Sequence, residues 1–260
     1  MAIIFGTSRN DILRVKDSFN RVLGKGGNDV IYADGFTNTI YGDDITEKVD
    51  DGNDTIFGSS RLGSRDIIYG GGGNDLIYGN EGNNYLNGGS GNDNLIGGSS
   101  YDMLLGGSGS DTLTGGGGID WFVFDNTHNS LDRINDFNNG ADKILIDTSI
   151  LNNSIDLSTL SNANHIFKTT TFANGTQFYQ LNPSDFLWLD RNGDSTDGIF
   201  AGVTEEIVVV YNNGVGTNPN SSNPLEQPPV IYYNDGTQYQ QLAMLSNGAL
   251  PQANNFILYS

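Results

Sequence analysis

The chain repeats itself every nine residues over most of its first half. From Arg61 onward seven nonamers follow one another without an insertion. They read RLGSRDIIY, GGGGNDLIY, GNEGNNYLN, GGSGNDNLI, GGSSYDMLL, GGSGSDTLT and GGGGIDWFV. The same period is present before residue 40 and resumes at Asp54, so residues 5–124 form one array. A sustained repeat of this kind predicts a solenoid in which each unit packs only against its neighbours.

The eighth position of every unit is apolar. With 36% apolar residues in the chain, twelve such hits in register have a chance of roughly five in a million. A flexible glycine-rich linker would show no such register, so the pattern indicates a folded core. The twelve residues are Leu13, Val22, Ile31, Ile40, Ile56, Ile68, Ile77, Leu86, Leu95, Leu104, Leu113 and Phe122.

Glycine dominates the first, second and fourth positions of the unit. Glycine tolerates the positive φ angles of a tight turn, where a Cβ would clash. The last three residues of each unit then form a short strand whose central side chain points inward. Two units make one coil, and coils stack at the ~4.8 Å strand spacing. The sequence therefore predicts an all-β fold, a parallel β-roll with a thin aliphatic core.

Acidic residues occupy the sixth position. Stacking places Asp75, Asp93 and Asp111 above one another on one edge of the roll. Two carboxylates ~4.8 Å apart repel by about 1 kcal/mol in water and by about 3 to 4 kcal/mol at an effective dielectric near 20. A divalent cation between the two carboxylates turns this repulsion into a net attraction. The other edge carries Asp66, Asn84, Asp102 and Asp120.

Calcium fits this chemistry best. It takes six to eight oxygen ligands, whereas magnesium demands a tighter octahedron and transition metals favour the His or Cys that the array lacks. The competing interpretation is that the aspartates only cap turns.

The units resemble the GGxGxDxUx repeats of the RTX family, secreted proteins that include serralysin metalloproteases and hemolysin-type toxins. In that family each ion lies between two successive turns of one edge. The first turn supplies the backbone carbonyls of its second and fourth positions and its Asp carboxylate. The next turn supplies the carbonyls of its first and third positions and its own Asp carboxylate. The resemblance implies three sites: Gly71, Gly73, Asp75, Gly88, Ser90 and Asp93; Gly89, Gly91, Asp93, Gly106, Ser108 and Asp111; and Gly98, Ser100, Asp102, Gly115, Gly117 and Asp120.

Some turns depart from the pattern. Asn84 replaces an aspartate, so sites that share its turn are expected to be weaker or empty. The segment 14–20 has no glycine and is expected to be metal-free. Asp11 and Asp29 keep enough of the pattern for a fourth site, and Asp66 is a further candidate ligand.

The second half loses the period. The stretch 132–147, DRINDFNNGADKILID, resembles the segment that follows the repeats in serralysin C-terminal domains, so residues 1–124 are expected to form the roll and 125–212 a β-rich cap. Strand-like runs occur at 143–146, 186–189 and 207–211.

An acidic turn lies within the expected cap. The segment DRNGDSTD has carboxylate spacing typical of short calcium loops and resembles turns of serralysin C-terminal domains; a plain polar turn is the alternative. Its candidate ligands are Asp190, Asn192, Asp194 and Asp197.

The remaining chain reads as a loop and a hairpin. Residues 213–229 hold four of the six prolines and are expected to be a loop, and 230–233 and 239–244 a hairpin. By family resemblance, the apolar ending within 230–260 implies an address for a type I secretion transporter.

Charge and motifs narrow the function. Thirty-one acidic against twelve basic residues give a net charge of −19, which disfavours nucleic acid and anionic membranes as partners. There is no cysteine, no apolar stretch long enough to span a bilayer, and no N-terminal signal core. HExxH and GxSxG motifs are absent, and the only two histidines, His128 and His165, show no metal-ligand spacing.

These observations predict a protein that is not an enzyme. We expect a calcium-binding protein, extracellular or at the cell surface, secreted without a cleavable N-terminal signal and serving a structural, surface or matrix role. The alternative is an enzyme or carbohydrate-binding module in residues 125–260.

Overall fold

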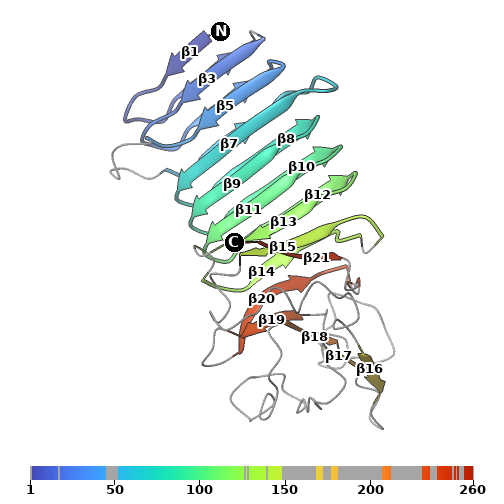
Figure 1. Ribbon diagram of the computed structural model, residues 1–260. Helices are drawn as coiled ribbons and strands as arrows, with labels where there is room; N and C mark the ends of the chain where they lie inside the picture. The colour runs from blue at the N-terminus through green and yellow to red at the C-terminus, as the bar shows by residue number, and fades with distance from the viewer. Residues whose placement is uncertain are drawn as a thin grey trace.

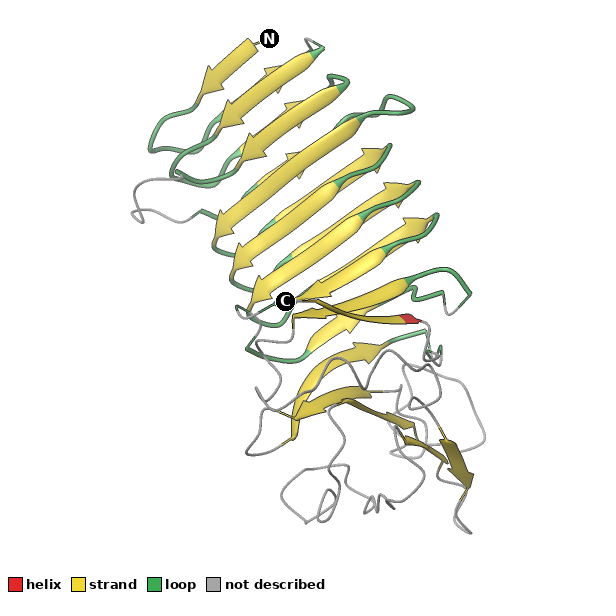
Figure 2. Ribbon diagram, viewed as in Figure 1, coloured by secondary structure: helices red, strands yellow, loops and turns green. Residues whose placement is uncertain are grey.

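The computed structural model describes most of the first 147 residues and separate strands beyond them. Described are residues 2–147 apart from 17, 45–51, 126, 128 and 139, and then 168–171, 177–180, 207–211, 230–234, 239–247, 249, 251 and 255–259. Every longer element in these ranges is a β-strand, with one helical turn directly before the last strand (Figure 2). No helix in the described ranges is long and apolar enough to cross a membrane.

Two sheets run along the length of the molecule and face each other across a narrow interior (Figure 1). The first sheet has nine strands: β1 (Ala2–Phe5), β3 (Phe19–Leu23), β5 (Thr37–Tyr41), β7 (Arg65–Gly72), β9 (Tyr85–Ser90), β11 (Met103–Ser108), β13 (Trp121–Phe124), β15 (Lys143–Asp147) and β21 (Phe256–Tyr259).

The second sheet begins, at the N-terminal end of the roll, with β2 (Ile12–Val15), β4 (Val30–Ala33), β6 (Thr55–Phe57), β8 (Leu76–Glu81), β10 (Asn94–Ser99), β12 (Thr112–Gly117) and β14 (Asp132–Ile134). It continues through β20 (Tyr239–Leu245), β19 (Val230–Asn234), β18 (Ile207–Tyr211), β17 (Gln177–Gln180) and β16 (Lys168–Thr171).

The repeat sets the strand register. Leu95 of β10 pairs with Ile77 of β8 and Leu113 of β12, each eighteen residues away. All pairs within the array are parallel, which confirms the predicted parallel β-roll. The strands are longer than the three residues expected, because the first two glycines of the next unit stay in the ladder, as in the pairing of Gly98 with Gly116.

The irregular stretch between residues 41 and 66 is absorbed by two turns. On one sheet Ile31 pairs with Ile56, 25 residues later, and Ile56 pairs with Ile77, 21 residues later. The two turns therefore hold seven and three extra residues, while the strands on either side keep their register. The insertion expected near residues 43–51 is thus one of two, and the second follows Gly58.

The core is a double column of eighth-position side chains. Eleven of the twelve predicted residues are completely buried, and Leu13, in the edge strand β2, packs against them while partly exposed. Inward and outward residues alternate along each strand, as in β5, because successive side chains point to opposite faces. Ile134 and Ile144 extend the column beyond the repeats.

The roll continues past residue 124, the boundary expected from the period. β14 and β15 pair in parallel with β12 and β13 and add one more coil. β20 and β21 then pair in parallel with β14 and β15, so the end of the sequence lies beside the roll (Figure 1). β19 and β20 pair antiparallel, as the hairpin prediction required.

Candidate metal centre along the edges of the roll

The sixth-position aspartates form a hydrogen-bonded ladder along the first edge. The backbone N–H of Asp54 donates to Oδ1 of Asp75 at 2.8 Å, and that of Asp75 donates to Oδ1 of Asp93 at 2.8 Å. The pattern continues from Asp93 to Asp111 at 2.8 Å and from Asp111 to Asp132 at 2.9 Å. Each carboxylate is therefore held by one oxygen, and the column is buried.

The second oxygen of these carboxylates is left without a partner. Within the described residues, Oδ2 is buried and accepts no hydrogen bond in six aspartates. Burying an unpaired carboxylate oxygen destabilises the folded state far more than burying an unpaired neutral polar group. A cation or a proton is therefore needed at Oδ2. The six are Asp29, Asp54, Asp75, Asp93, Asp102 and Asp111.

Backbone carbonyls surround the same positions. A Cβ built on Gly70 would clash with Oδ2 of Asp75 and lie 2.6 Å from the carbonyl oxygen of Gly88 in the next turn. The same arrangement recurs one coil further on, around Gly88 and Asp93. Two electron-rich oxygens thus point at one small space that only a glycine leaves open. Such a cradle suits a hard cation.

The other predicted carbonyls also point between turns. A Cβ on Gly89 would clash with the carbonyl oxygen of Gly71, and a Cβ on Gly91 with that of Gly73. The third-position carbonyl of Ser108 points back and accepts the N–H of Gly91 at 2.8 Å. In these turns the carbonyls of the second and fourth positions face the next turn, and those of the first and third positions face the preceding one. That calcium binds them stays a prediction.

Burial makes these carboxylates reluctant to ionise. Desolvation, reinforced by neighbouring carboxylates, raises the pKa of Asp75 to about 9 and that of Asp111 to about 8. Desolvation likewise raises the pKa of Asp102 to about 8 and that of Asp54 to about 7. In every case the backbone hydrogen bond to Oδ1 opposes the rise. The column therefore requires a neutralising charge, either a bound cation or a proton.

The second edge is divided between carboxylates and amides. Asp102 and Asp120 repeat the aspartate pattern, with a hydrogen bond of 3.0 Å from Asp102 N–H to Asp120 Oδ1. The carbonyls of Gly98 and Ser100 point at Gly116 and Gly118 in the next turn. These residues are members of the third predicted site, which stays a prediction.

Asparagine fills the remaining positions of that edge. Where an aspartate would present Oδ2, Asn84 presents its Nδ2, near Gly79, and it donates to the carbonyl of Gly82. Asn38 Nδ2 donates to the carbonyls of Ala33 at 2.9 Å and Gly35 at 3.3 Å. The amide hydrogens thus contact carbonyls that a cation would otherwise bind. The weak or empty sites expected around Asn84 stay a prediction.

Two predicted ligands have an Oδ2 that already accepts hydrogen bonds. Asp66 Oδ1 accepts from the N–H and the Nδ2 of Asn38, and its Oδ2 accepts from Ser59 N–H at 2.6 Å. Asp11 Oδ2 accepts from the N–H and Oγ1 of Thr7 at 2.6 and 2.8 Å. Both differ from Asp93, so the structure favours them less as ligands.

Sequence reasoning missed several members of these edges. The sequence marks Asp54 as a repeat position but does not predict it as a ligand, because the insertion before it hides that Gly42 is its turn partner. A Cβ on Gly42 would clash with Asp54 Oδ2. Asp132 and Asp142 continue the two ladders beyond residue 124, since Asp142 Oδ1 accepts from Asp120 N–H at 3.0 Å. Asp54, Asp132 and Asp142 are all aspartates, but their spacing departs from the nine-residue period. The strict period therefore does not identify them as ligands.

A second ladder, of fifth-position asparagines, runs outside the first. The N–H of Asn74 donates to Oδ1 of Asn53 at 2.6 Å, and that of Asn92 to Oδ1 of Asn74 at 2.7 Å. Ser110 N–H ends this run on Asn92 Oδ1 at 2.8 Å. In the sequence, this ladder is indicated only by the Asn that often precedes the sixth-position Asp. The sequence alone does not show what that Asn does.

The predicted calcium loop of the second half, Asp190, Asn192, Asp194 and Asp197, lies outside the described residues. So do the strand predicted at 186–189, the loop at 213–229 and both histidines. In the described part of the chain, no group of three or more His, Cys, Asp and Glu side chains converges on one point. The sites between turns combine one or two carboxylates with carbonyls instead.

The fold and these cradles define a class: a parallel β-roll with oxygen-lined cation sites between its turns. Residues 5–40, 62–95 and 87–122 match the family model of the RTX calcium-binding nonapeptide repeat, in four copies. The match supports the RTX family for the repeat array and calcium as its ion. No curated protein matches the chain significantly.

Proposed function

We propose that this RTX-type protein acts outside the cell, where it folds on binding calcium and serves a structural, surface or matrix role. The observation that carries the proposal is the set of six buried, unpartnered Oδ2 atoms, five of which lie close to a carbonyl oxygen of the next turn. Calcium supplies the positive charge that such an arrangement requires. Extracellular calcium is plentiful and cytosolic calcium scarce, so the ion would also signal the compartment.

The proposed ligands follow from the cradles. On the first edge they are the carboxylates of Asp29, Asp54, Asp75, Asp93 and Asp111 with the carbonyls of the adjoining turns, among them those of Gly71, Gly73, Gly88, Gly89, Gly91 and Gly106. On the second edge they are Asp102 and Asp120 with the carbonyls of Gly98, Ser100 and Gly115.

Export would precede folding. A chain with a net charge of −19 and 36% apolar residues stays soluble when unfolded, and an unfolded chain can thread a transporter. We propose that the C-terminal region carries the address, as the family resemblance implies, and that the partner for export is a type I transporter.

Deleting the last ~50 to 60 residues, an estimate for the address region, should keep the protein inside the native host. Immunoblots of cells and medium measure this. The matched control is the double variant Asp93→Ala, Asp111→Ala, which loses calcium ligands but keeps the C-terminus and should still reach the medium. Normal export of the truncated chain would contradict the proposal.

The alternative, an enzyme or carbohydrate-binding module in residues 125–260, concerns residues that the structure mostly leaves undescribed. The absence of enzymatic activity therefore stays a prediction.

A further inference from the structure

A hollow of about 570 Å³ lies on the outer face of the first sheet, near the N-terminal end of the roll. It is lined by Phe19, Asn20 and Arg21 of β3 and by Thr37, Thr39 and Tyr41 of β5. Strand alternation directs the side chains of Phe19, Arg21 and the three β5 residues outward, whereas Val22 and Ile40 enter the core. Asn20 is a sixth-position residue whose Nδ2 donates to Asn38 Oδ1 at 2.7 Å, whereas the other five lining residues lie outside the cradles between turns.

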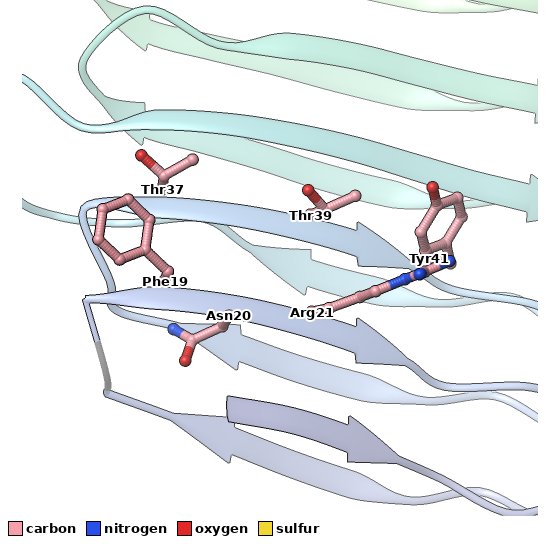
Figure 3. A pocket seen from close by; sticks show the side chains of 6 residues that line it. All are labelled: Phe19, Asn20, Arg21, Thr37, Thr39 and Tyr41. Carbon is pink, nitrogen blue, oxygen red and sulfur yellow. The ribbon is translucent and has the colours of Figure 1, made fainter. Parts of the chain in front are cut away.

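The hollow combines aromatic, hydroxyl and cationic groups. Figure 3 shows Phe19 beside Thr37 at one end, Thr39 in the middle, and Arg21 extending along β3 toward Tyr41 at the other end. Phe19 is 58% exposed, although it is a large apolar side chain. The arrangement offers a ring-sized apolar wall next to donors for hydrogen bonds.

Arg21 is the unexplained member. Its Nε is buried and has no hydrogen-bond partner in the described part of the chain. Its guanidinium carbon lies 5.6 Å from the centre of the Tyr41 ring, a looser contact than the 3.9 Å between Arg14 and Tyr32 on the other sheet. Arg61, by contrast, forms a salt bridge with Asp34 at 3.5 Å. Arg21 is half-buried, and an arginine whose buried N–H lacks a partner is suited to bind an anion.

Positive charge is concentrated around this hollow. Thr37 is in register with Arg65 of β7, and Thr39 with Arg21, so cationic residues flank the threonines on both neighbouring strands. Arg21 and Arg65 therefore place two positive charges next to the hollow, in a chain whose net charge is −19.

We propose that this hollow binds an acidic sugar unit. The guanidinium of Arg21 would hold its carboxylate or sulfate, the hydroxyls of Thr37 and Thr39 would contact the ring hydroxyls, and Phe19 would cover the apolar face of the ring. A bare anion would leave Phe19 without a role, and a neutral sugar would leave Arg21 without one. The hollow is separate from the calcium sites, and its test is separate from the folding test.

The test is calorimetric titration of the calcium-loaded full chain with trigalacturonate, with a sulfated galactose trisaccharide, and with the neutral galactose trisaccharide. We expect one or both acidic probes to bind, the neutral probe not to bind, and added salt to weaken binding. The comparison of the two acidic probes shows which anion is preferred.

Two variants locate the site. Arg21→Gln should lower the affinity about tenfold or more, the usual effect of losing a charge-assisted hydrogen bond, and Thr39→Val should lower it by a smaller factor. Arg61→Gln, which removes a cation that is paired with Asp34, is the matched control and should bind normally. Circular dichroism confirms that each variant folds. Failure of both acidic probes to bind, or equal binding by Arg21→Gln, would overturn the proposal.

Discussion

Each sixth-position carboxylate of the aspartate pattern uses its two oxygens differently. In Asp93, Oδ1 accepts a backbone hydrogen bond from the preceding turn, while Oδ2 is buried beside a carbonyl of the following turn. One aspartate therefore borders two proposed cation sites, one on each side of its turn. Removing the aspartate should weaken both sites.

Replacing Asp93 with Ala should lower calcium affinity at two neighbouring sites by about tenfold or more, since ligand charge sets affinity in such sites. Asn84→Ala should have little effect, because its amide already presents a donor where a ligand oxygen would lie. Calorimetric calcium titrations of the two variants measure the difference. Equal losses would reject the site assignment.

Asn38 offers a test of metal-free turns. Asn38→Asp removes the donors to the carbonyls of Ala33 and Gly35 and places a second carboxylate against Asp66. At low calcium the variant should lose about 2 to 4 kcal/mol of stability, from several buried groups left unpaired. High calcium should restore part of this loss by filling the new site.

The urea midpoint at several calcium concentrations measures this effect. The matched control is Asn92→Asp, where the side-chain oxygen serves only as an acceptor for Ser110 N–H and the carboxylate keeps that role. The same urea shift in both variants would show that amide donors do not replace calcium at Asn38.

At the scale of the turn, glycine leaves room for the ion. Gly88 has ordinary backbone angles, so alanine would be tolerated there by the chain itself. Its Cβ would nevertheless clash with Oδ2 of Asp93 and lie 2.6 Å from the carbonyl oxygen of Gly106. The clash falls on the oxygens of the proposed cation site.

Gly88→Ala should therefore remove one bound calcium ion while leaving the rest of the array loaded. Native mass spectrometry in calcium counts the ions. Gly117→Ala is the matched control, because a Cβ added at Gly117 would meet no atom within 4 Å and the backbone angles there are also ordinary. An unchanged ion count in Gly88→Ala would place the ion elsewhere.

The strands and turns differ in how far the sequence predicts them. The apolar eighth position gave the register and the core column, since one inward side chain per strand is required wherever two sheets face each other. The displaced glycine partners, Gly42 for Asp54 and Gly58 for Asp66, could not be found from a strict nine-residue period. Extra residues in a turn leave the hydrogen-bonded ladder intact. Residues that stack on one another are therefore no longer eighteen positions apart in the sequence at these turns.

The end of the roll was also beyond the sequence. β14 and β15 lack the glycine pattern yet continue both sheets, because Ile134 and Ile144 supply the inward side chains and Asp132 and Asp142 the ladder oxygens. The pairing of β20 and β21 with this coil joins residues about a hundred positions apart. No local pattern encodes such a contact.

For the whole molecule, the raised carboxyl pKa values predict how pH acts when calcium is absent. The pKa of Asp75 rises to about 9 and that of Asp102 to about 8, both from an ordinary value of 3.8, chiefly through burial. A pKa that is higher in the folded state stabilises the fold fully below the unfolded value. This stabilisation is lost as pH rises through the folded value.

In chelator, the chain should therefore show more β-sheet at about pH 5 than at about pH 9, since protons replace the missing cations. Circular dichroism over this range measures the change, and the chain stays net negative above its isoelectric point near 4.1. With calcium present the trend should weaken or reverse, because calcium needs ionised carboxylates. More β-sheet at high pH in chelator would contradict the assignment of these aspartates as buried and unneutralised.

The most direct test is the far-ultraviolet circular dichroism of the full chain in excess chelator and then in millimolar calcium near neutral pH. If calcium neutralises the stacked carboxylates, residues 5–124 should be largely disordered in chelator and gain a strong β-sheet signal when calcium is added. A spectrum that is already that of a folded β-protein in chelator, and that calcium leaves unchanged, would contradict calcium-driven folding of the roll.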